Sequence, residues 1–193
     1  MLSDLKQKYP WPVKPDVRTF YHGFLHESNK FIFNRHRGDD IKVVIELGSW
    51  LGQSALYFYD LFPNAEIICI DHWEGSPELM NEYREVIPVL YETFLVNCWN
   101  YRDRITPIRI DSLNGLEICS KFGVDPDLIY IDASHTYDDC FQDMVFAYNL
   151  FENAIIIGDD WQYQDVREAV NDFNEKYGTS VDVVDNTWEI IRP

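Results

Sequence analysis

Short apolar runs alternate with helix-like stretches from residue 42 to the end of the chain, and this alternation is the strongest constraint on the fold. Five runs suited to strands lie at residues 42–47, 66–70, 105–110, 128–131 and 154–157. Strands that alternate with helices form βαβ units, which imply a parallel sheet with both faces covered. Two more runs, 180–184 and 188–191, are separated by a gap short enough for a hairpin. The sequence therefore predicts an α/β, Rossmann-like, doubly wound sheet of seven strands, mostly parallel, with a C-terminal antiparallel β-hairpin.

The stretches between the runs carry apolar residues at helical spacing. Helices are expected at residues 54–62, 77–99 (interrupted near Pro88), 113–122, 137–151 and 166–177. Residues 1–40 are polar and rich in aromatic residues, and a short helix is expected within 18–34. The sequence contains no repeat, low-complexity tract or interdomain linker. We therefore expect one domain over residues 1–193, with a helical lid segment at 1–40 and the Rossmann-like core at 41–193.

The charge balance of the chain limits its partners. It has 33 acidic and 16 basic residues, for a formal net charge of −17. A surface this negative repels phosphate backbones and anionic membranes, so neither nucleic acid nor a membrane is an expected partner. The four cysteines form no CxxC pair, and neither a signal peptide nor a membrane-spanning run is recognisable. These features predict a cytoplasmic protein. The first 40 residues suit either a cover over an active site or a contact with a second subunit in a homo-oligomer.

A glycine turn follows the first predicted strand. Gly48 and Gly52 lie between that strand and the next helix, where ligands of doubly wound sheets bind. Ser54 is placed to satisfy a free amide at the helix start. The turn lacks the G-x-G-x-x-G pattern of dinucleotide sites, and the acidic Glu46 before it suits a cationic ligand. S-adenosylmethionine has both a sulfonium and an ammonium group. A turn that only connects strand and helix is the alternative.

Asp71 ends the second predicted strand, where an acidic residue can bind ribose hydroxyls or cap a turn. Residues 46–54, Glu-Leu-Gly-Ser-Trp-Leu-Gly-Gln-Ser, resemble the E-L-G-x-x-x-G-x-S loop of catechol O-methyltransferase-like enzymes. Residues 70–75 resemble the D-x-W-x-G stretch of small-molecule methyltransferases, including macrolide-sugar methyltransferases and cephalosporin hydroxylase-like proteins. The resemblance spans about residues 40–175 and implies a class I S-adenosylmethionine-dependent methyltransferase. The cofactor-binding residues expected from the turn, the strand ends and the resemblance are Glu46, Gly48, Ser49, Gly52, Ser54, Asp71, Trp73, Asp111 and Ser112.

Three carboxylates follow the fourth and fifth predicted strands. Asp132 ends one strand, and Asp159 and Asp160 end the next. Neighbouring parallel strands lie about 4.8 Å apart, so these side chains are expected to converge. Because carboxylates repel one another without a cation, they are expected to bind a divalent metal such as Mg²⁺. The resemblance implies the same three metal ligands, and solvated strand-end residues are the alternative.

His135 lies three residues after Asp132. An imidazole accepts a proton near neutral pH, which suits a general base. The resemblance implies this role, because the sugar O-methyltransferases have a D-x-x-H motif here. The lysine that catechol enzymes have shortly after the first aspartate is absent, which favours the sugar-like branch. A residue that only begins a helix is the alternative.

These observations predict an S-adenosylmethionine-dependent O-methyltransferase, Mg²⁺-assisted, that acts on a hydroxyl of a small molecule. A sugar or natural-product intermediate as acceptor follows only from the resemblance. Three alternatives stay open: a metal-independent small-molecule methyltransferase, a nicotinamide-dependent Rossmann oxidoreductase, and a non-catalytic binding protein with the same fold.

Overall fold

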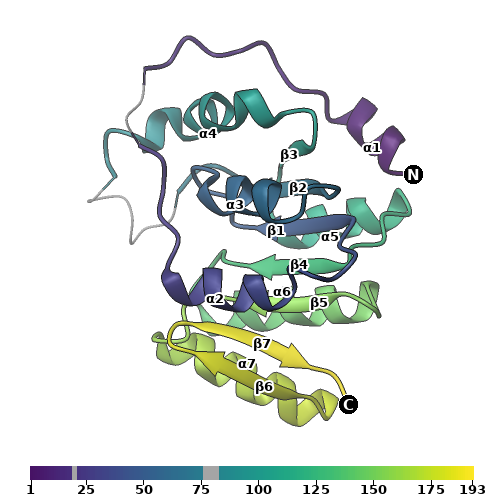
Figure 1. Ribbon diagram of the computed structural model, residues 1–193. Coiled ribbons are helices and arrows are strands. Elements are labelled where there is room, and N and C mark those ends of the chain that lie inside the picture. The colour runs from purple at the N-terminus through teal and green to yellow at the C-terminus, as the bar shows by residue number, and fades with distance from the viewer. Residues whose placement is uncertain (19–20, 76–82) are drawn as a thin grey trace.

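The computed structural model describes residues 1–18, 21–75 and 83–193, and in it a seven-stranded sheet runs through the molecule (Figure 1). The strand order is β3-β2-β1-β4-β5-β7-β6. β1 to β5 are parallel, whereas β7 pairs antiparallel with both β5 and β6. The predicted Rossmann-like sheet with its closing hairpin is therefore confirmed. The strands are β1 (Val43–Leu47), β2 (Glu66–Asp71), β3 (Ile105–Arg109), β4 (Leu128–Ile131), β5 (Ile155–Gly158), β6 (Ser180–Val184) and β7 (Thr187–Ile191).

Helices cover both faces of the sheet (Figure 1). One buried apolar cluster joins the sheet to α5, α6 and α7. A second cluster on the opposite face joins it to α2, α3 and α4. Because both faces are covered, the parallel strands are mainly apolar, as the short runs in the sequence indicated, and Glu46 on β1 is a buried exception. The helices are α1 (Leu2–Lys8), α2 (Glu27–Arg35), α3 (Gln53–Leu61), α4 (Leu90–Cys98), α5 (Ser112–Lys121), α6 (Tyr137–Leu150) and α7 (Gln164–Tyr177).

Two helical regions differ from the prediction. The first part of the helix expected over residues 77–99 lies outside the described residues. Its described part contains a 3₁₀ turn at Ile87–Val89, then α4, then a second 3₁₀ turn at Trp99–Tyr101. The first of these turns includes Pro88, which cannot donate a helical hydrogen bond. Helix α1 was not expected.

Strand register brings the carboxyl ends of the central strands together. Leu47 on β1 pairs with Ile131 on β4, and Ile131 pairs with Gly158 on β5. The residues that follow these strand ends therefore lie side by side. Gly158 also makes room for the hairpin, because a Cβ atom there would lie 2.0 Å from the buried ring of Trp188.

The N-terminal segment runs from α1 past α4 to α2, which lies beside β7 (Figure 1). The α2 side chains Ile32 and Phe33 are fully buried in the cluster on that face. No helix within the described part of the chain has the length and apolar character needed to span a membrane.

Candidate functional site

The glycine turn between β1 and α3 is held by close packing. Gly48 and Gly52 have φ angles of 85° and 88°, in the left-handed region that favours glycine. A Cβ atom on Gly48 would lie 1.8 Å from the carbonyl oxygen of Asp132, and one on Gly52 would lie 2.5 Å from Cys98 Sγ. The turn is therefore fixed between the end of β4 and helix α4.

A buried carboxyl group lies beneath this turn. Glu46 is fully buried, and Ser54 donates a hydrogen bond to its Oε1 atom. Its Oε2 atom has no hydrogen-bond donor of ordinary geometry within the described residues. Burial raises the pKa of Glu46, although the nearby hydroxyls of Ser49 and Ser54 favour its ionised form. A polar atom left unsatisfied in the interior is costly, and functional sites often contain one.

Asp71 connects the glycine turn to the end of β2. Its Oδ2 atom accepts the backbone N–H of Trp50 at 2.9 Å, and its Oδ1 atom accepts that of Trp73 at 2.6 Å. The Trp73 indole is 2% exposed and donates from Nε1 to the Trp50 carbonyl oxygen at 2.8 Å. Burial raises the pKa of Asp71, and these two N–H groups oppose that rise. Each carboxylate oxygen keeps a second lone pair for a ligand.

Asp111 and Ser112 lie at the carboxyl end of β3. Asp111 is the N-cap of α5, where it accepts hydrogen bonds from the backbone N–H and the side-chain amide of Asn114 at 3.0 and 2.8 Å. The Ser112 hydroxyl bonds the carboxyl of Asp143 on α6. Both predicted cofactor residues thus stabilise the start of α5 at the edge of the sheet that carries the glycine turn.

The three predicted carboxylates do converge. The pKa of Asp132 is raised well above its ordinary value by burial and by the charges of Asp159 and Asp160. Tyr130 donates its hydroxyl to Asp132 Oδ2 at 3.1 Å. Burial and the charge of Asp160 also raise the pKa of Asp159. This edge of the sheet is therefore strongly acidic, and its electrostatic repulsion favours a bound proton or cation.

The imidazole of His135 lies against the third carboxylate. Its Nε2 atom lies 2.7 Å from Asp160 Oδ2, and Asp160 Oδ1 accepts a hydrogen bond from Gln162 at 2.8 Å. Asp160 has a φ angle of 66°, an uncommon backbone conformation for a residue with a side chain. When the imidazole is neutral, a proton on Nε2 bonds Asp160 and leaves the lone pair on Nδ1. The pair thus fixes the tautomer of the neutral ring, and its Nδ1 atom is buried.

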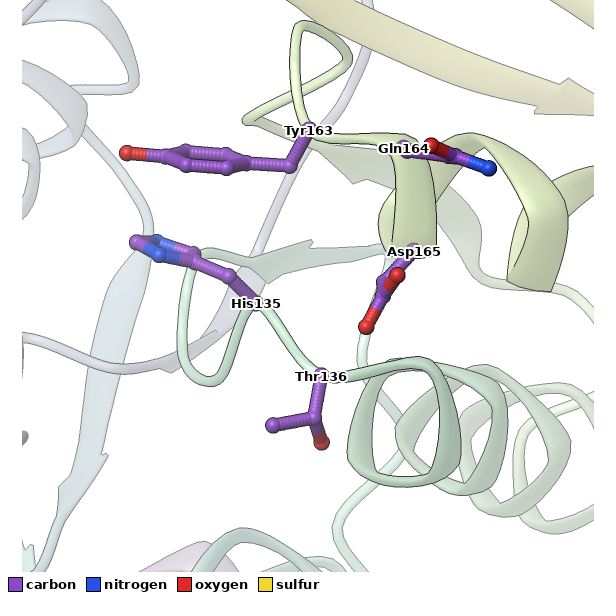
Figure 2. A pocket seen from close by; sticks show the side chains of 5 residues that line it. All are labelled: His135, Thr136, Tyr163, Gln164 and Asp165. Carbon is purple, nitrogen blue, oxygen red and sulfur yellow. The ribbon is translucent and has the colours of Figure 1, made fainter.

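A cavity of about 280 Å³ opens beside this pair. The Tyr163 ring stacks on His135, with ring centroids 4.4 Å apart and planes inclined by 11° (Figure 2). Thr136, at the start of α6, and Asp165, in the first turn of α7, line the same cavity. A larger hollow of about 430 Å³ lies around Asn100, before the amino end of β3 and away from these groups.

The metal prediction has less support than the convergence of the carboxylates suggests. Throughout residues 1–18, 21–75 and 83–193, no three His, Cys, Asp or Glu side chains are arranged so that they could hold a metal ion. Asp160 is paired with His135, and the Asn29 side chain bonds Asp159. These groups do not form a coordination set as they are placed.

Comparison with known proteins now identifies the family. A family model described as a methyltransferase domain matches residues 45–161, which is more than half of the chain. The chain belongs to the methyltransferase domain family. No protein of curated function matches this methyltransferase in sequence.

Solved structures similar to this methyltransferase have the same fold. The O-methyltransferase TomG from Streptomyces achromogenes, which is involved in tomaymycin synthesis and was solved with SAM, has a TM-score of 0.64 and 12% identity over 89% of this chain and 82% of its own. An O-methyltransferase from Bacillus cereus, solved with SAH, has a TM-score of 0.61 and 14% identity over 100% of this chain and 89% of its own. SAH-bound PaMTH1 from Podospora anserina has a TM-score of 0.55 and 20% identity over 84% of this chain and 76% of its own. At these identities the similarity shows the fold alone.

Several residues of the site lie outside the family match and were not predicted from the sequence. Asn29 on α2 is fully buried, bonds Asp159, and donates to the hydroxyl of Thr187 on β7 at 2.8 Å. Ser28 accepts a hydrogen bond from the same hydroxyl at 3.0 Å. His26 is near enough to Asp159 to lower its pKa through charge. The N-terminal segment of this methyltransferase therefore contributes directly to the acidic edge of the sheet.

Proposed function

We propose that this methyltransferase transfers the methyl group of S-adenosylmethionine to a hydroxyl of a small molecule, such as a sugar or a natural-product intermediate. The observation that carries the proposal is the His135–Asp160 pair, 2.7 Å apart, beside a cavity at the carboxyl edge of the sheet. Family membership supports methyl transfer. The neighbours solved with SAM or SAH support the choice of donor, and two of them are O-methyltransferases.

The residues around the glycine turn fit the donor chemically. The unsatisfied Oε2 atom of Glu46 and the remaining lone pairs of Asp71 suit a ligand with a cationic group and ribose hydroxyls. Seven further residues would complete the binding surface from the turn and the neighbouring strand ends: Gly48, Ser49, Gly52, Ser54, Trp73, Asp111 and Ser112. The close packing of the turn holds these groups in place before a ligand arrives.

When bound, S-adenosylmethionine supplies a methyl group on a sulfonium sulfur, and its transfer to an acceptor oxygen leaves S-adenosylhomocysteine and one proton. In the proposed reaction, His135 accepts that proton as the oxygen–carbon bond forms, which requires its buried Nδ1 atom to become accessible to the acceptor. Asp160, hydrogen-bonded to Nε2, holds the imidazole in the required tautomer and stabilises the imidazolium that results. The stack with Tyr163 fixes the plane of the ring. Positioning of the two reactants provides much of the rate enhancement.

Replacement of His135 by glutamine tests this role. We expect H135Q to keep its affinity for S-adenosylhomocysteine in calorimetry and to lose methyl transfer by about 100-fold or more, as loss of a general base does. The H36Q variant is a matched control, because His36 lies on the outer end of α2. Full turnover by H135Q would contradict the assigned base. Binding of NAD without binding of S-adenosylhomocysteine would contradict the donor and favour an oxidoreductase.

The magnesium requirement stays a prediction from the sequence. Asp132, Asp159 and Asp160 are oxygen donors of the kind that Mg²⁺ prefers. Excess EDTA followed by Mg²⁺, added to purified wild-type protein, separates the two alternatives. Activity lost with EDTA and restored by Mg²⁺ supports a metal-assisted enzyme, whereas full activity in EDTA establishes the metal-independent alternative.

A further inference from the structure

Three hydrogen bonds around Asp71 join the end of β2 to the glycine turn. Each oxygen of the carboxylate accepts one backbone N–H, Oδ2 that of Trp50 at 2.9 Å and Oδ1 that of Trp73 at 2.6 Å. The indole of Trp73 completes the arrangement, because its Nε1–H donates to the carbonyl oxygen of Trp50 at 2.8 Å. We call these three hydrogen bonds the Asp71 clamp. Both backbone polar groups of Trp50 are therefore held by the clamp, one by Asp71 and the other by Trp73.

Both tryptophans of the clamp have an uncommon backbone conformation. The φ angle of Trp50 is 44° and that of Trp73 is 51°, in the left-handed region. Among the residues that the structure describes, four that are not glycine have a positive φ angle, and these are two of them. Such conformations are costly for bulky residues and persist only where the surroundings fix them. The cost falls on the two residues that align the N–H groups of the clamp, which indicates that this alignment matters to the site.

The Trp73 indole is enclosed by protein rather than open to a ligand. It is 2% exposed, and its ring packs against Tyr91 and Phe94 of α4, with ring centroids 4.8 and 4.7 Å away. Its one polar atom, Nε1, already donates to Trp50. The side chain therefore has neither an open face nor a free donor for a cofactor. It can act on a bound cofactor only through the groups that it holds.

The clamp leaves half of the hydrogen-bonding capacity of Asp71 unused. An ionised carboxylate has about four lone-pair sites, of which the two backbone N–H groups occupy one on each oxygen. Two adjacent hydroxyls, as in a ribose, can use the remaining sites. Rotation of the carboxylate would break a bond to Trp50 or Trp73, so the clamp also fixes the direction in which these sites point.

We propose that Trp73 is a positioning residue for the donor. Through its bond to the Trp50 carbonyl oxygen, the indole holds the glycine turn against Asp71, and Asp71 thereby selects a ligand with a pair of ribose hydroxyls. The inference rests on the proposed function, because the ligand that carries the ribose is S-adenosylmethionine. It deepens that function by assigning Trp73 a role through Asp71 in place of direct contact with the cofactor.

Two ligands that differ only in the ribose test this role: S-adenosylhomocysteine and its 2′,3′-dideoxy analogue. Calorimetry measures their binding to the full-length wild-type protein and to W73F, which keeps an aromatic ring and lacks the indole N–H. Hydroxyls bonded to a carboxylate should give wild type a preference of roughly 10–100-fold for S-adenosylhomocysteine. We expect W73F to reduce this preference about fivefold, the size of one neutral hydrogen bond.

Two results overturn the inference. The first is a W73F variant that weakens the binding of both ligands by the same factor, because a merely structural role does not depend on the ribose hydroxyls. The second is a wild-type protein that binds the two ligands with equal affinity.

F94L is the matched control, because Phe94 packs on the same indole and takes no part in the clamp. It also supports the glycine turn, since a Cβ atom on Gly52 would lie 3.2 Å from its ring. The substitution therefore loosens the same packing without removing a hydrogen bond. We expect F94L to weaken the binding of both ligands equally and to leave the preference unchanged. A loss of preference in F94L as large as that in W73F overturns the specific role of the indole N–H.

An isosteric analogue at position 73 keeps the test decisive where W73F does not fold. In 3-benzothienylalanine the two-ring shape of tryptophan is kept and sulfur replaces the N–H group. Its incorporation in place of Trp73 should reduce the preference for S-adenosylhomocysteine by the same factor, about fivefold. A preference equal to that of wild type overturns the inference.

The same measurements distinguish this inference from the proposed function. A wild-type protein that does not bind S-adenosylhomocysteine contradicts the proposed donor, and the inference with it. Tight binding of S-adenosylhomocysteine, with the same ribose preference in wild type and W73F, contradicts the role of Trp73 alone.

Discussion

Replacement of Asp143 by asparagine should stabilise the protein at alkaline pH and have a much smaller effect at acidic pH. Asp143 lies on α6, is 4% exposed, and bonds the Ser112 hydroxyl on α5. Burial, with the charge of Asp139 as a second cause, raises its pKa from 3.8 to about 7. Asparagine has nearly the same shape, keeps an oxygen that accepts the Ser112 hydroxyl, and has no charge to bury.

The direction of the effect follows from proton linkage. Because the folded pKa is raised, the contribution of this group to stability is fully present below pH 3.8 and is lost as pH rises through about 7. The shift of about three pKa units corresponds to roughly 4 kcal/mol, of which about 3 kcal/mol falls between pH 5 and pH 8. The advantage of D143N over wild type should therefore grow by about 3 kcal/mol across that interval.

Urea unfolding of both proteins at several pH values between 5 and 8 measures this difference. For a domain of this size, about 3 kcal/mol also corresponds to a rise of roughly 6–12 °C in Tm. D125N controls for net charge, since Asp125 is exposed. A D143N advantage that is the same at pH 5 and pH 8, or equal to that of D125N, would refute the assignment of a buried, protonated carboxyl at this position.

Three further predictions concern the N-terminal segment and the hairpin. N29A should lower the free energy of unfolding by about 1–3 kcal/mol, because it removes the buried amide that bonds both Asp159 and the Thr187 hydroxyl, and S28A should cost less; urea unfolding compares them, and an equal cost would contradict the role of Asn29. G158A should prevent stable folding, since a Cβ atom would lie 2.0 Å from the Trp188 ring; a Tm close to that of wild type would contradict the packing. The hydrogen bond to Glu189 raises the pKa of His36, so its stabilising effect is present below pH 6.5 and lost as pH rises through the raised value; the Tm difference between wild type and H36Q should shrink over that interval, and a constant difference would contradict the ion pair.

The sheet was predictable from the sequence because each strand is a short, mainly apolar run bounded by polar or turn-forming residues. Helix α1 was missed for a physical reason. It has seven residues and a single buried side chain, Leu5. Lys6 reaches Glu66 and the carbonyl oxygen of Asp103, both at 2.8 Å. Such contacts are far apart along the chain and leave no local periodicity.

The difference between local sequence patterns and contacts far apart along the chain also explains which site residues could be predicted. Asp132, Asp159 and Asp160 follow strand ends, so the topology alone was enough to place them together. Asn29 and Thr187 are 158 residues apart, and their hydrogen bond exists only because α2 lies beside β7. Neither residue belongs to a recognisable motif. Asn29 lies in a polar segment of the sequence, where an asparagine is common. Its role can be recognised only in the folded structure, where it is buried.

The acidic edge of the sheet is costly for a protein that needs only to fold. The pKa values of Asp132 and Asp159 are raised by burial and by neighbouring carboxylates, so their ionised forms destabilise the folded state at neutral pH. Asp160 adds an unfavourable backbone conformation at the same place. With neutral side chains at these strand ends, the protein would fold at a lower free-energy cost. Because these three unfavourable features meet beside His135, rather than being spread over the surface, the arrangement is best explained by selection for the chemistry of the site.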